Sequence, residues 1–257
     1  EAIAAGARRI VVGLGGTCVN DCGAGMLEGL GAVATSQAGE RVALSGDVGR
    51  LMSVHAIDLV GARHMFRDIE LVAATDVDVP LLGARGATHG FARQKGATEE
   101  DLPLLEGALA TVASACPRRE DGKDASVMLG AGAAGGVGFV LLTLGATRES
   151  GFDTVWQESD IGLAGVDLII TGEGRLDWQS MRGKVVSGVA KCGQSAGVPV
   201  IAIAGDVTIT PRERSEMGLD AVYSLTEWFG AERAMREPEQ CLAEAATRLV
   251  RTWGRLE

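Results

Sequence analysis

The 257-residue chain is 46% hydrophobic, which is enough apolar sequence for one large domain or two modest ones. Its formal net charge of −10 excludes a general nucleic-acid-binding surface, because most of that surface would repel the phosphate backbone. Glycine occurs 37 times, roughly twice its ordinary frequency, without a collagen-like period. The glycines cluster at the ends of apolar runs, and this placement predicts tight loops rather than flexible linkers.

The cysteines and the lengths of the apolar runs indicate the cellular environment. Five cysteines are scattered along the chain without a C-x-x-C pair, and only three histidines accompany them. This distribution predicts reduced thiols in a cytoplasmic protein rather than disulfides or a tetrahedral zinc site. No run of about twenty apolar residues predicts a membrane span. Residues 1–7 resemble the last turns of a helix, so we expect a segment upstream of them.

Residues 9–14 predict a strand that runs into a glycine-rich loop and then into a short helix over residues 24–30. Glycines let the loop backbone approach a ligand closely, and the helix would direct its first N–H groups at the same place. This combination favours a phosphate-like anion, and a plain β–α turn is the structural alternative. The residues that we expect to contact the anion are Gly15, Gly16, Thr17, Asn20 and Asp21.

A second strand, predicted over residues 69–75, ends at two carboxylates, Asp76 and Asp78. Carboxylates just past a strand end are placed to bind Mg²⁺ or a sugar-like hydroxyl group. An Asx turn, in which the side chain bonds the local backbone, is the alternative.

Residues 80–97 predict an irregular loop that is rich in glycine and in basic and amide side chains. In an acidic protein such a loop suits contact with an anion, and Gln94 and Lys95 are our candidates for that contact. Residues 102–116 then show the apolar spacing of an amphipathic core helix.

Residues 130–135 fit the pattern G-x-G-x-x-G and open a helix predicted over residues 137–144. A dinucleotide-binding fingerprint also requires a proper strand before the glycines and an acidic residue about twenty positions later. The apolar lead-in here is only residues 126–129, so the match is weak. A dinucleotide-binding oxidoreductase remains an alternative on this pattern alone.

Residues 166–171 form a short, β-branched run that predicts a buried strand. A polar loop over residues 172–177 follows, with Glu173, Arg175 and Asp177, and Lys184 comes early in the next helix. Ligand sites of α/β proteins lie beyond the carboxyl ends of parallel strands, so we expect part of an active site here. The remaining predicted elements are a helix over 183–195, strands over 198–204 and 220–225, a helix capped by Thr210 and a C-terminal helix.

The order of these blocks resembles the bacterial glycerate kinase family, of the type that lacks a Walker A loop. The similarity covers essentially the whole chain. The blocks that carry it are IVVGLGGTCVNDCGAGM at 10–26, DVDVPLLGARGAT at 76–88, FARQKGA at 91–97, GAGAAGGVGF at 130–139, ITGEGRLDWQSMRGK at 170–184 and IAIAGDV at 201–207.

The resemblance implies a two-domain α/β enzyme that transfers the γ-phosphoryl group of ATP to a hydroxyl of D-glycerate with the help of Mg²⁺. We therefore expect a parallel, layered, Rossmann-like sheet with a second, inserted α/β lobe. Residues 1–40 and 161–257 would form the discontinuous Rossmann-like domain, and residues 41–160 the inserted lobe. Strand 9–14 would then share a sheet with strand 166–171.

Phosphoryl transfer needs cations and backbone N–H groups around the phosphates, a carboxylate to hold Mg²⁺ and another to accept the proton of the attacking hydroxyl. For catalysis and binding of the acceptor we assign Asp177, Glu173, Arg175 and Lys184. For ATP we assign Gly15, Gly16, Thr17, Asn20, Asp21, Gln94 and Lys95. For Mg²⁺ we assign Asp76 and Asp21.

Two departures from the family pattern keep an alternative open. The family begins with a segment that carries an A-P-D-S-F-K-like and a D-G-G-E-G-like loop, and neither is in this chain. Cys22 stands where the family usually has glycine, and its side chain would crowd a left-handed turn. These departures motivate a catalytically weakened, ligand-binding paralogue as the alternative. The expected partners are D-glycerate and ATP, with no nucleic acid or membrane, and a homodimer is left open.

Overall fold

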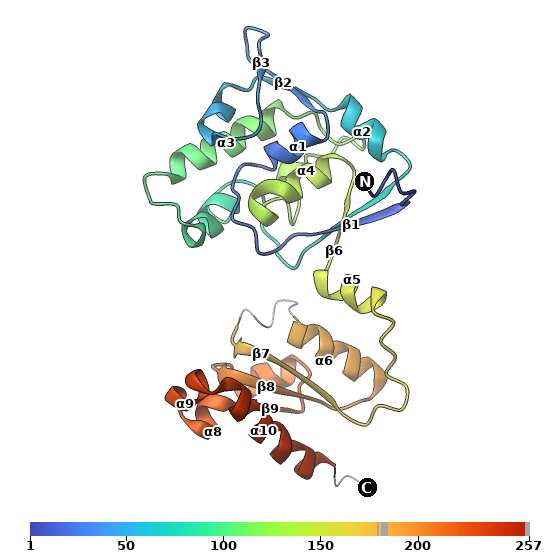
Figure 1. Cartoon of the computed structure of the whole chain (residues 1–257), viewed down its shortest axis with the longest axis vertical. Helices are drawn as coiled ribbons and strands as arrows, with labels where there is room; N and C mark the ends of the chain where they lie inside the picture. The colour runs from blue at the N-terminus through green and yellow to red at the C-terminus, as the bar shows by residue number, and fades with distance from the viewer. Residues whose placement is uncertain (179, 181–184, 255–257) are drawn as a thin grey trace. The chain divides into compact units, whose positions relative to one another are not determined.

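The structure, a computed structural model, describes residues 1–178, 180 and 185–254. It divides into two compact units, residues 1–151 and 152–257, and each unit contains a parallel three-stranded sheet (Figure 1). The predicted fold class, a mixed α/β protein with parallel sheets, is confirmed. None of the helices in the described part of the chain is long and apolar enough to cross a membrane.

The first unit is built on the strand order β1-β5-β6, with β5 in the centre. The central strand is buried along four of its five residues, which explains its continuous apolar sequence. A small antiparallel sheet of order β3-β2-β4 lies in the same unit. The strands are β1 (Arg9–Gly13), β2 (Val33–Thr35), β3 (Arg41–Val42), β4 (Ala56–Asp58), β5 (Glu70–Ala74) and β6 (Thr147–Glu149).

Helices complete the first unit around an aliphatic core. Helix α4 is buried along most of its length and packs against β5 and α1. The α-helices are α1 (Ala24–Gly29), α2 (Val60–Phe66), α3 (Leu102–Ala115) and α4 (Val137–Thr143). Short 3₁₀ segments span Val48–Ser53, Arg93–Lys95, Ala125–Val127 and Ala133–Gly136, and a π-helical turn spans Thr88–Ala92.

The second unit is a sheet of order β7-β8-β9 with helices on both faces. Val200 and Ala202 of β8 belong to the core on one face, and Ile201 and Ile203 belong to the core on the other. The strands are β7 (Ile169–Leu176), β8 (Val200–Val207) and β9 (Ala221–Ser224). The helices are α5 (Gly151–Glu158), α6 (Val185–Ala196), α7 (Pro211–Glu216), α8 (Leu225–Phe229), α9 (Ala231–Arg236) and α10 (Pro238–Trp253).

The predicted arrangement of the domains is wrong. β1 pairs with β5, which lies within the predicted inserted lobe over residues 41–160, and β7 pairs with β8 in a different sheet. The chain divides between Gly151 and Phe152, so residues 1–40 do not join residues 161–257 in one sheet. A short apolar strand carries no sequence signal of its partner, so neither the alternation of elements nor the resemblance specifies which strand pairs with β1.

Candidate functional site

The loop after β1 leaves backbone N–H groups available to a ligand. Leu14 still donates to the carbonyl of Ala74 at 2.9 Å, and the chain then leaves the sheet through Gly15 and Gly16, which are exposed. Gly16 has a φ of 64°, a left-handed conformation that glycine adopts without strain. No described residue accepts a hydrogen bond from the N–H of Gly15, Gly16 or Thr17. The predicted role of these three residues in binding phosphate stays a prediction.

Part of the N-terminus of α1 is occupied by the chain itself. The N–H of Cys22 donates to the carbonyl of Gly135 at 3.0 Å, and the N–H of Gly23 donates to Asp21 Oδ1 at 3.0 Å. The N–H of Ala24 donates to the carbonyl of Asp21 at 3.1 Å. The chain itself occupies these three donors, and the predicted anion contact from the rest of helix 24–30 stays a prediction.

Cys22 adopts the left-handed conformation that its place in the glycine-rich loop requires. Its φ is 61°, and its side chain is fully buried. Burial raises the pKa of its thiol well above the usual value, with smaller contributions from Cys116 and Asp21. The pKa of Cys116 is raised to about 12, also mainly by burial. Both thiols are therefore expected to stay protonated at neutral pH.

The loop after β1 is tied to the segment 88–95, which contains the other predicted ATP-binding residues. Lys95 Nζ donates to the carbonyl of Val19 at 2.7 Å, and Asn20 Nδ2 donates to the buried Thr88 Oγ1 at 3.2 Å. Desolvation lowers the pKa of Lys95, and nearby Cys18 and Asp21 oppose that shift. The structure thus brings Asn20, Asp21 and Lys95 together.

Two polar side chains of this region keep bonding capacity for a ligand. Asn20 Oδ1 is buried and has no hydrogen-bond partner among the described residues. A buried polar atom without a partner is costly unless a ligand or water satisfies it. Gln94 is exposed next to Lys95 in the same 3₁₀ segment. Their predicted contact with ATP is not tested by this geometry.

The Mg²⁺ candidates Asp76 and Asp21 each use one carboxylate oxygen within the chain. Asp76 Oδ1 accepts from Ser150 Oγ at 3.0 Å and from the N–H of Gly151 at 2.9 Å, so it links the ends of β5 and β6. Among the described residues, no group of three potential ligands could hold a metal ion. The two Oδ2 atoms receive no hydrogen bond from a described residue, which fits an ion held by one or two carboxylates together with substrate phosphates.

The glycines at 130–136 pack the protein against itself. A Cβ on Gly135 would lie 2.0 Å from the carbonyl oxygen of Val19, and one on Gly136 would lie 2.5 Å from the Cα of Cys22. The segment before them, Ala125–Val127, is a 3₁₀ helix rather than a strand. The G-x-G-x-x-G match is therefore not a dinucleotide-binding fingerprint, and the oxidoreductase alternative loses its only support.

In the second unit, Glu173 and Arg175 lie on β7 itself, which extends to Leu176, rather than in a loop after a strand over 166–171. The ladder continues because glycine allows the close approach of β8. A Cβ on Gly172 would lie 2.2 Å from the carbonyl oxygen of Ile203. Glu173 and Arg175 lie two residues apart near the carboxyl end of the sheet, where ligand sites of α/β proteins are found.

Glu173 and Arg175 have different surroundings on β7. Glu173 is paired with the small Ala204, and its Oε1 atom is buried without a hydrogen-bond partner among the described residues. Arg175 is paired with Asp206, and Arg175 Nε lies 3.5 Å from Asp206 Oδ2. Asp206 Oδ1 accepts a hydrogen bond from Thr226 Oγ1 at 3.1 Å.

Sequence reasoning did not assign Asp206 or Thr226 to the site. A signal for Asp206 was present, because a carboxylate near the end of an apolar run is the same pattern that singled out Asp76 after β5. No comparable signal marks Thr226, which reaches Asp206 through the turn between β9 and α8.

Asp177 follows β7 in a tight turn. Its N–H donates to Ser180 Oγ at 3.2 Å, and its carbonyl accepts from the N–H of Ser180 at 3.0 Å. Helix α6 begins at Val185, so Asp177 is not the residue that caps it. Lys184, the fourth predicted catalytic residue, lies outside the described residues.

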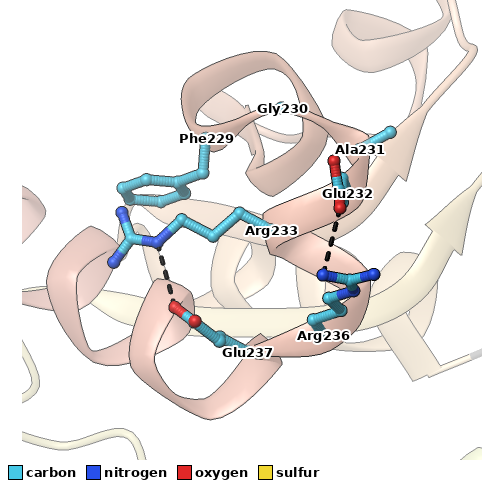
Figure 2. A pocket seen from close by; sticks show the side chains of 7 residues that line it. All are labelled: Phe229, Gly230, Ala231, Glu232, Arg233, Arg236 and Glu237. Carbon is cyan, nitrogen blue, oxygen red and sulfur yellow. Dashed lines mark hydrogen bonds and ion pairs between the residues drawn. The ribbon is translucent and has the colours of Figure 1, made fainter.

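A surface hollow in the second unit lies apart in sequence from all the predicted residues. Figure 2 shows its lining, which spans residues 229–237. Arg233 Nε lies 3.2 Å from Glu237 Oε2, and Arg236 Nη1 lies 3.1 Å from Glu232 Oε1. Because these charges are already paired with one another, we do not assign the hollow to the candidate site.

Comparison with known proteins identifies the family. A sequence model of the glycerate kinase family matches residues 1–254. The chain is 40% identical over 227 residues to a glycerate kinase of Bacillus subtilis (strain 168), which covers 87% of this chain and 59% of that protein. It is 36% identical over 258 residues to the glycerate 2-kinase of Escherichia coli (strain K12), covering 98% of this chain and 66% of that protein.

A solved structure agrees with these sequence matches. The crystal structure of a protein from Salmonella typhimurium LT2, named as a candidate glycerate kinase 2, superimposes with a TM-score of 0.71 at 34% identity. The match covers 100% of this chain and 67% of that one. This chain thus spans about three fifths of the length of relatives such as the Bacillus subtilis protein. The sequence and structural matches agree along the whole chain, which belongs to the glycerate kinase family.

Proposed function

We propose that the protein transfers the γ-phosphoryl group of ATP to a hydroxyl group of D-glycerate. Membership of the family supports the reaction class. One observation carries the assignment of the acceptor site: Glu173 Oε1, which is buried without a hydrogen-bond partner among the described residues, belongs to a residue only two positions from Arg175 on β7. A hydrogen-bond acceptor beside a cation suits a small molecule that carries both a hydroxyl group and a carboxylate.

The acceptor is held by complementary groups in this proposal. No described residue accepts a hydrogen bond from Arg175 Nη1 or Nη2, so these two nitrogens can bind a carboxylate in bidentate fashion. Glu173 Oε1 accepts a hydrogen bond from a hydroxyl of glycerate. Asp177, two residues beyond Arg175, orients the attacking hydroxyl or takes its proton, as phosphoryl transfer requires.

The nucleotide is held by the first unit in this proposal. The N–H groups of Gly15, Gly16 and Thr17 bind phosphate oxygens, and Lys95 supplies positive charge beside them. Its contact with the carbonyl of Val19 holds the ammonium against the loop. Asn20 and Gln94 provide further polar contacts, and Lys184 belongs to the catalytic cations.

Asp21 and Asp76 are the residues that would hold Mg²⁺. When bound, the ion would neutralise negative charge on the phosphate oxygens. Asp21 and Asp76 would each contribute one carboxylate oxygen, and phosphate oxygens of the nucleotide would complete the coordination.

The conformation of Cys22 supports the kinase over a catalytically weakened paralogue. The alternative arose because a side chain in place of glycine would crowd a left-handed turn. Cys22 takes that turn with a φ of 61° and buries its side chain, so the loop keeps the path that glycine would give it.

The test combines turnover with binding. The protein is incubated with ATP, MgCl₂ and D-glycerate, and formation of ADP and of phosphoglycerate is followed by a coupled assay and by ³¹P NMR. We expect ADP to form only in the presence of D-glycerate, and the NMR spectrum identifies the phosphorylated hydroxyl. Calorimetric titrations with D-glycerate and ATP accompany the assay. Binding without turnover would favour the weakened paralogue, and neither binding nor turnover would overturn the proposal.

A further inference from the structure

A directed chain of hydrogen bonds runs across the carboxyl end of the second sheet and ends at Arg175. The N–H of Glu227 donates to Ser224 Oγ at 3.2 Å, and Ser224 Oγ lies 2.9 Å from Thr226 Oγ1. Thr226 Oγ1 donates to Asp206 Oδ1 at 3.1 Å, and Asp206 Oδ2 lies 3.5 Å from Arg175 Nε. The last contact in this series of hydrogen bonds is therefore the ion pair between Asp206 and Arg175.

Counting protons fixes the direction of each bond. An ionised carboxylate only accepts hydrogen bonds, so the single hydroxyl proton of Thr226 is given to Asp206. The proton between Ser224 and Thr226 must then come from Ser224. Ser224 in turn accepts the N–H of Glu227 as the N-cap of α8. Every donor points toward Asp206, and bonds aligned in this way strengthen one another.

Stability does not explain this arrangement. The side chains of Arg175 and Asp206 are 63% and 44% exposed, and ion pairs at such positions contribute little to folding. The chain of bonds instead fixes the carboxylate of Asp206, which engages Arg175 through Nε. The opposite end of the planar guanidinium, with Nη1 and Nη2, is left to face a ligand.

We propose that Asp206, held by Thr226 and Ser224, is a positioning residue that orients Arg175 for a bidentate bond to the carboxylate of the acceptor. The inference rests on the proposed function, because it takes Arg175 as the group that binds glycerate. It also predicts the selectivity of the site. Hydroxy acids bind, whereas neutral polyols of similar size do not, because they lack the carboxylate that Arg175 is oriented to bind.

Thr226 offers the sharpest test because two substitutions separate its hydroxyl from its shape. Thr226→Val keeps the shape and removes the hydrogen bond to Asp206, and Thr226→Ser keeps the hydroxyl. Thr247→Val is the matched control, since Thr247 is an exposed residue of α10 whose hydroxyl donates to the carbonyl of Ala243 within the same helix. D-glycerate is titrated into each protein, and the arginine Nε–H signals are followed by ¹H–¹⁵N NMR.

We expect Thr226→Val to raise the Kd for D-glycerate about 5- to 20-fold, which corresponds to about 1–1.8 kcal/mol at 1.4 kcal/mol per factor of ten. For Thr226→Ser and Thr247→Val, the Kd for D-glycerate should stay within about twofold of the value for the unsubstituted protein. A twofold difference is close to the additivity error of such measurements. The inference is overturned if Thr226→Val binds as tightly as the unsubstituted protein, or if Thr226→Ser loses as much affinity as Thr226→Val. If the unsubstituted protein binds no D-glycerate, the proposed function fails and this inference fails with it.

Discussion

The contact between the loop after β1 and the glycine segment at 133–136 makes a quantitative prediction. Gly135 has a φ of 66°, and a Cβ there would lie 2.0 Å from the carbonyl oxygen of Val19. Gly135→Ala therefore incurs two costs. The left-handed conformation costs an L-residue roughly 1–2 kcal/mol. Forcing the two backbones apart adds about 1–3 kcal/mol, as overpacking does in a core.

Gly145→Ala isolates the first of these costs. Gly145 follows α4 with a φ of 103°, and nothing lies within 4 Å of a Cβ placed on it. It therefore bears the conformational cost without the collision. At about 2–4 °C per kcal/mol for a unit of this size, Gly135→Ala should melt about 2–12 °C below Gly145→Ala. Differential scanning calorimetry of the two variants measures this difference.

The same pair of variants tests the function of the loop. Displacing Val19 moves the carbonyl that holds Lys95, so Gly135→Ala should raise the KM for ATP more than Gly145→Ala does. Equal melting temperatures for the two variants would refute the close contact. A lower melting temperature with an unchanged KM for ATP would show that the contact is structural and that the loop after β1 does not bind the nucleotide.

Three further outcomes are expected. Asp177→Asn should lower kcat about 10²–10⁴-fold, the contribution of a general base, with little change in the KM for ATP, and steady-state rates check this; a kcat within threefold would remove Asp177 from the mechanism. Thr210→Ala should cost about 1 kcal/mol in urea unfolding without affecting activity, because it removes the capping box at the start of α7. Since burial lowers the pKa of Lys95, the unfolded chain binds more protons between the folded and unfolded pKa values. The stability that Lys95 contributes should therefore rise with pH toward the unfolded value of about 10.4, and Lys95→Met should lack this rise in denaturant titrations across that range; an identical pH profile would contradict the shift.

Local features of the fold could be predicted because their causes are local. The capping box predicted at Thr210 is present, with the N–H of Glu213 donating to Thr210 Oγ1 and the N–H of Thr210 donating to Glu213 Oε2. The strand predicted over 9–14 is β1, and the amphipathic helix predicted over 102–116 is α3. In each case side chains a few residues apart determine the element.

Features that depend on distant parts of the chain could not be predicted in the same way. The sequence of β1 does not specify β5 as its partner, and the prediction of one sheet with β7 failed for that reason. From the sequence alone, Gly172 indicates a loop. In the structure the backbone of Ile203 packs closely against Gly172 within the sheet, so the sequence did not predict the extension of β7. Gly135 likewise resembled a dinucleotide-binding glycine because its neighbour, Val19, is far away in sequence.

The candidate site was predicted in part. Asn20, Asp21 and Lys95 were assigned to one site, and the structure brings them together within the first unit. Glu173 and Arg175 were assigned to another part of the site, and they lie two residues apart on β7 in the second unit. Asp206 and Thr226 were missed, since their role depends on the register of β7 with β8 and on the turn after β9.

The most direct test of the acceptor site is the steady-state KM of Arg175→Met for both substrates. Two charge-assisted hydrogen bonds at about 1.5–3 kcal/mol each predict that the KM for D-glycerate rises about 100-fold or more. The KM for ATP should remain within about threefold, because less than 1 kcal/mol separates values that close. A normal KM for D-glycerate with a raised KM for ATP would place Arg175 on the nucleotide and contradict the account.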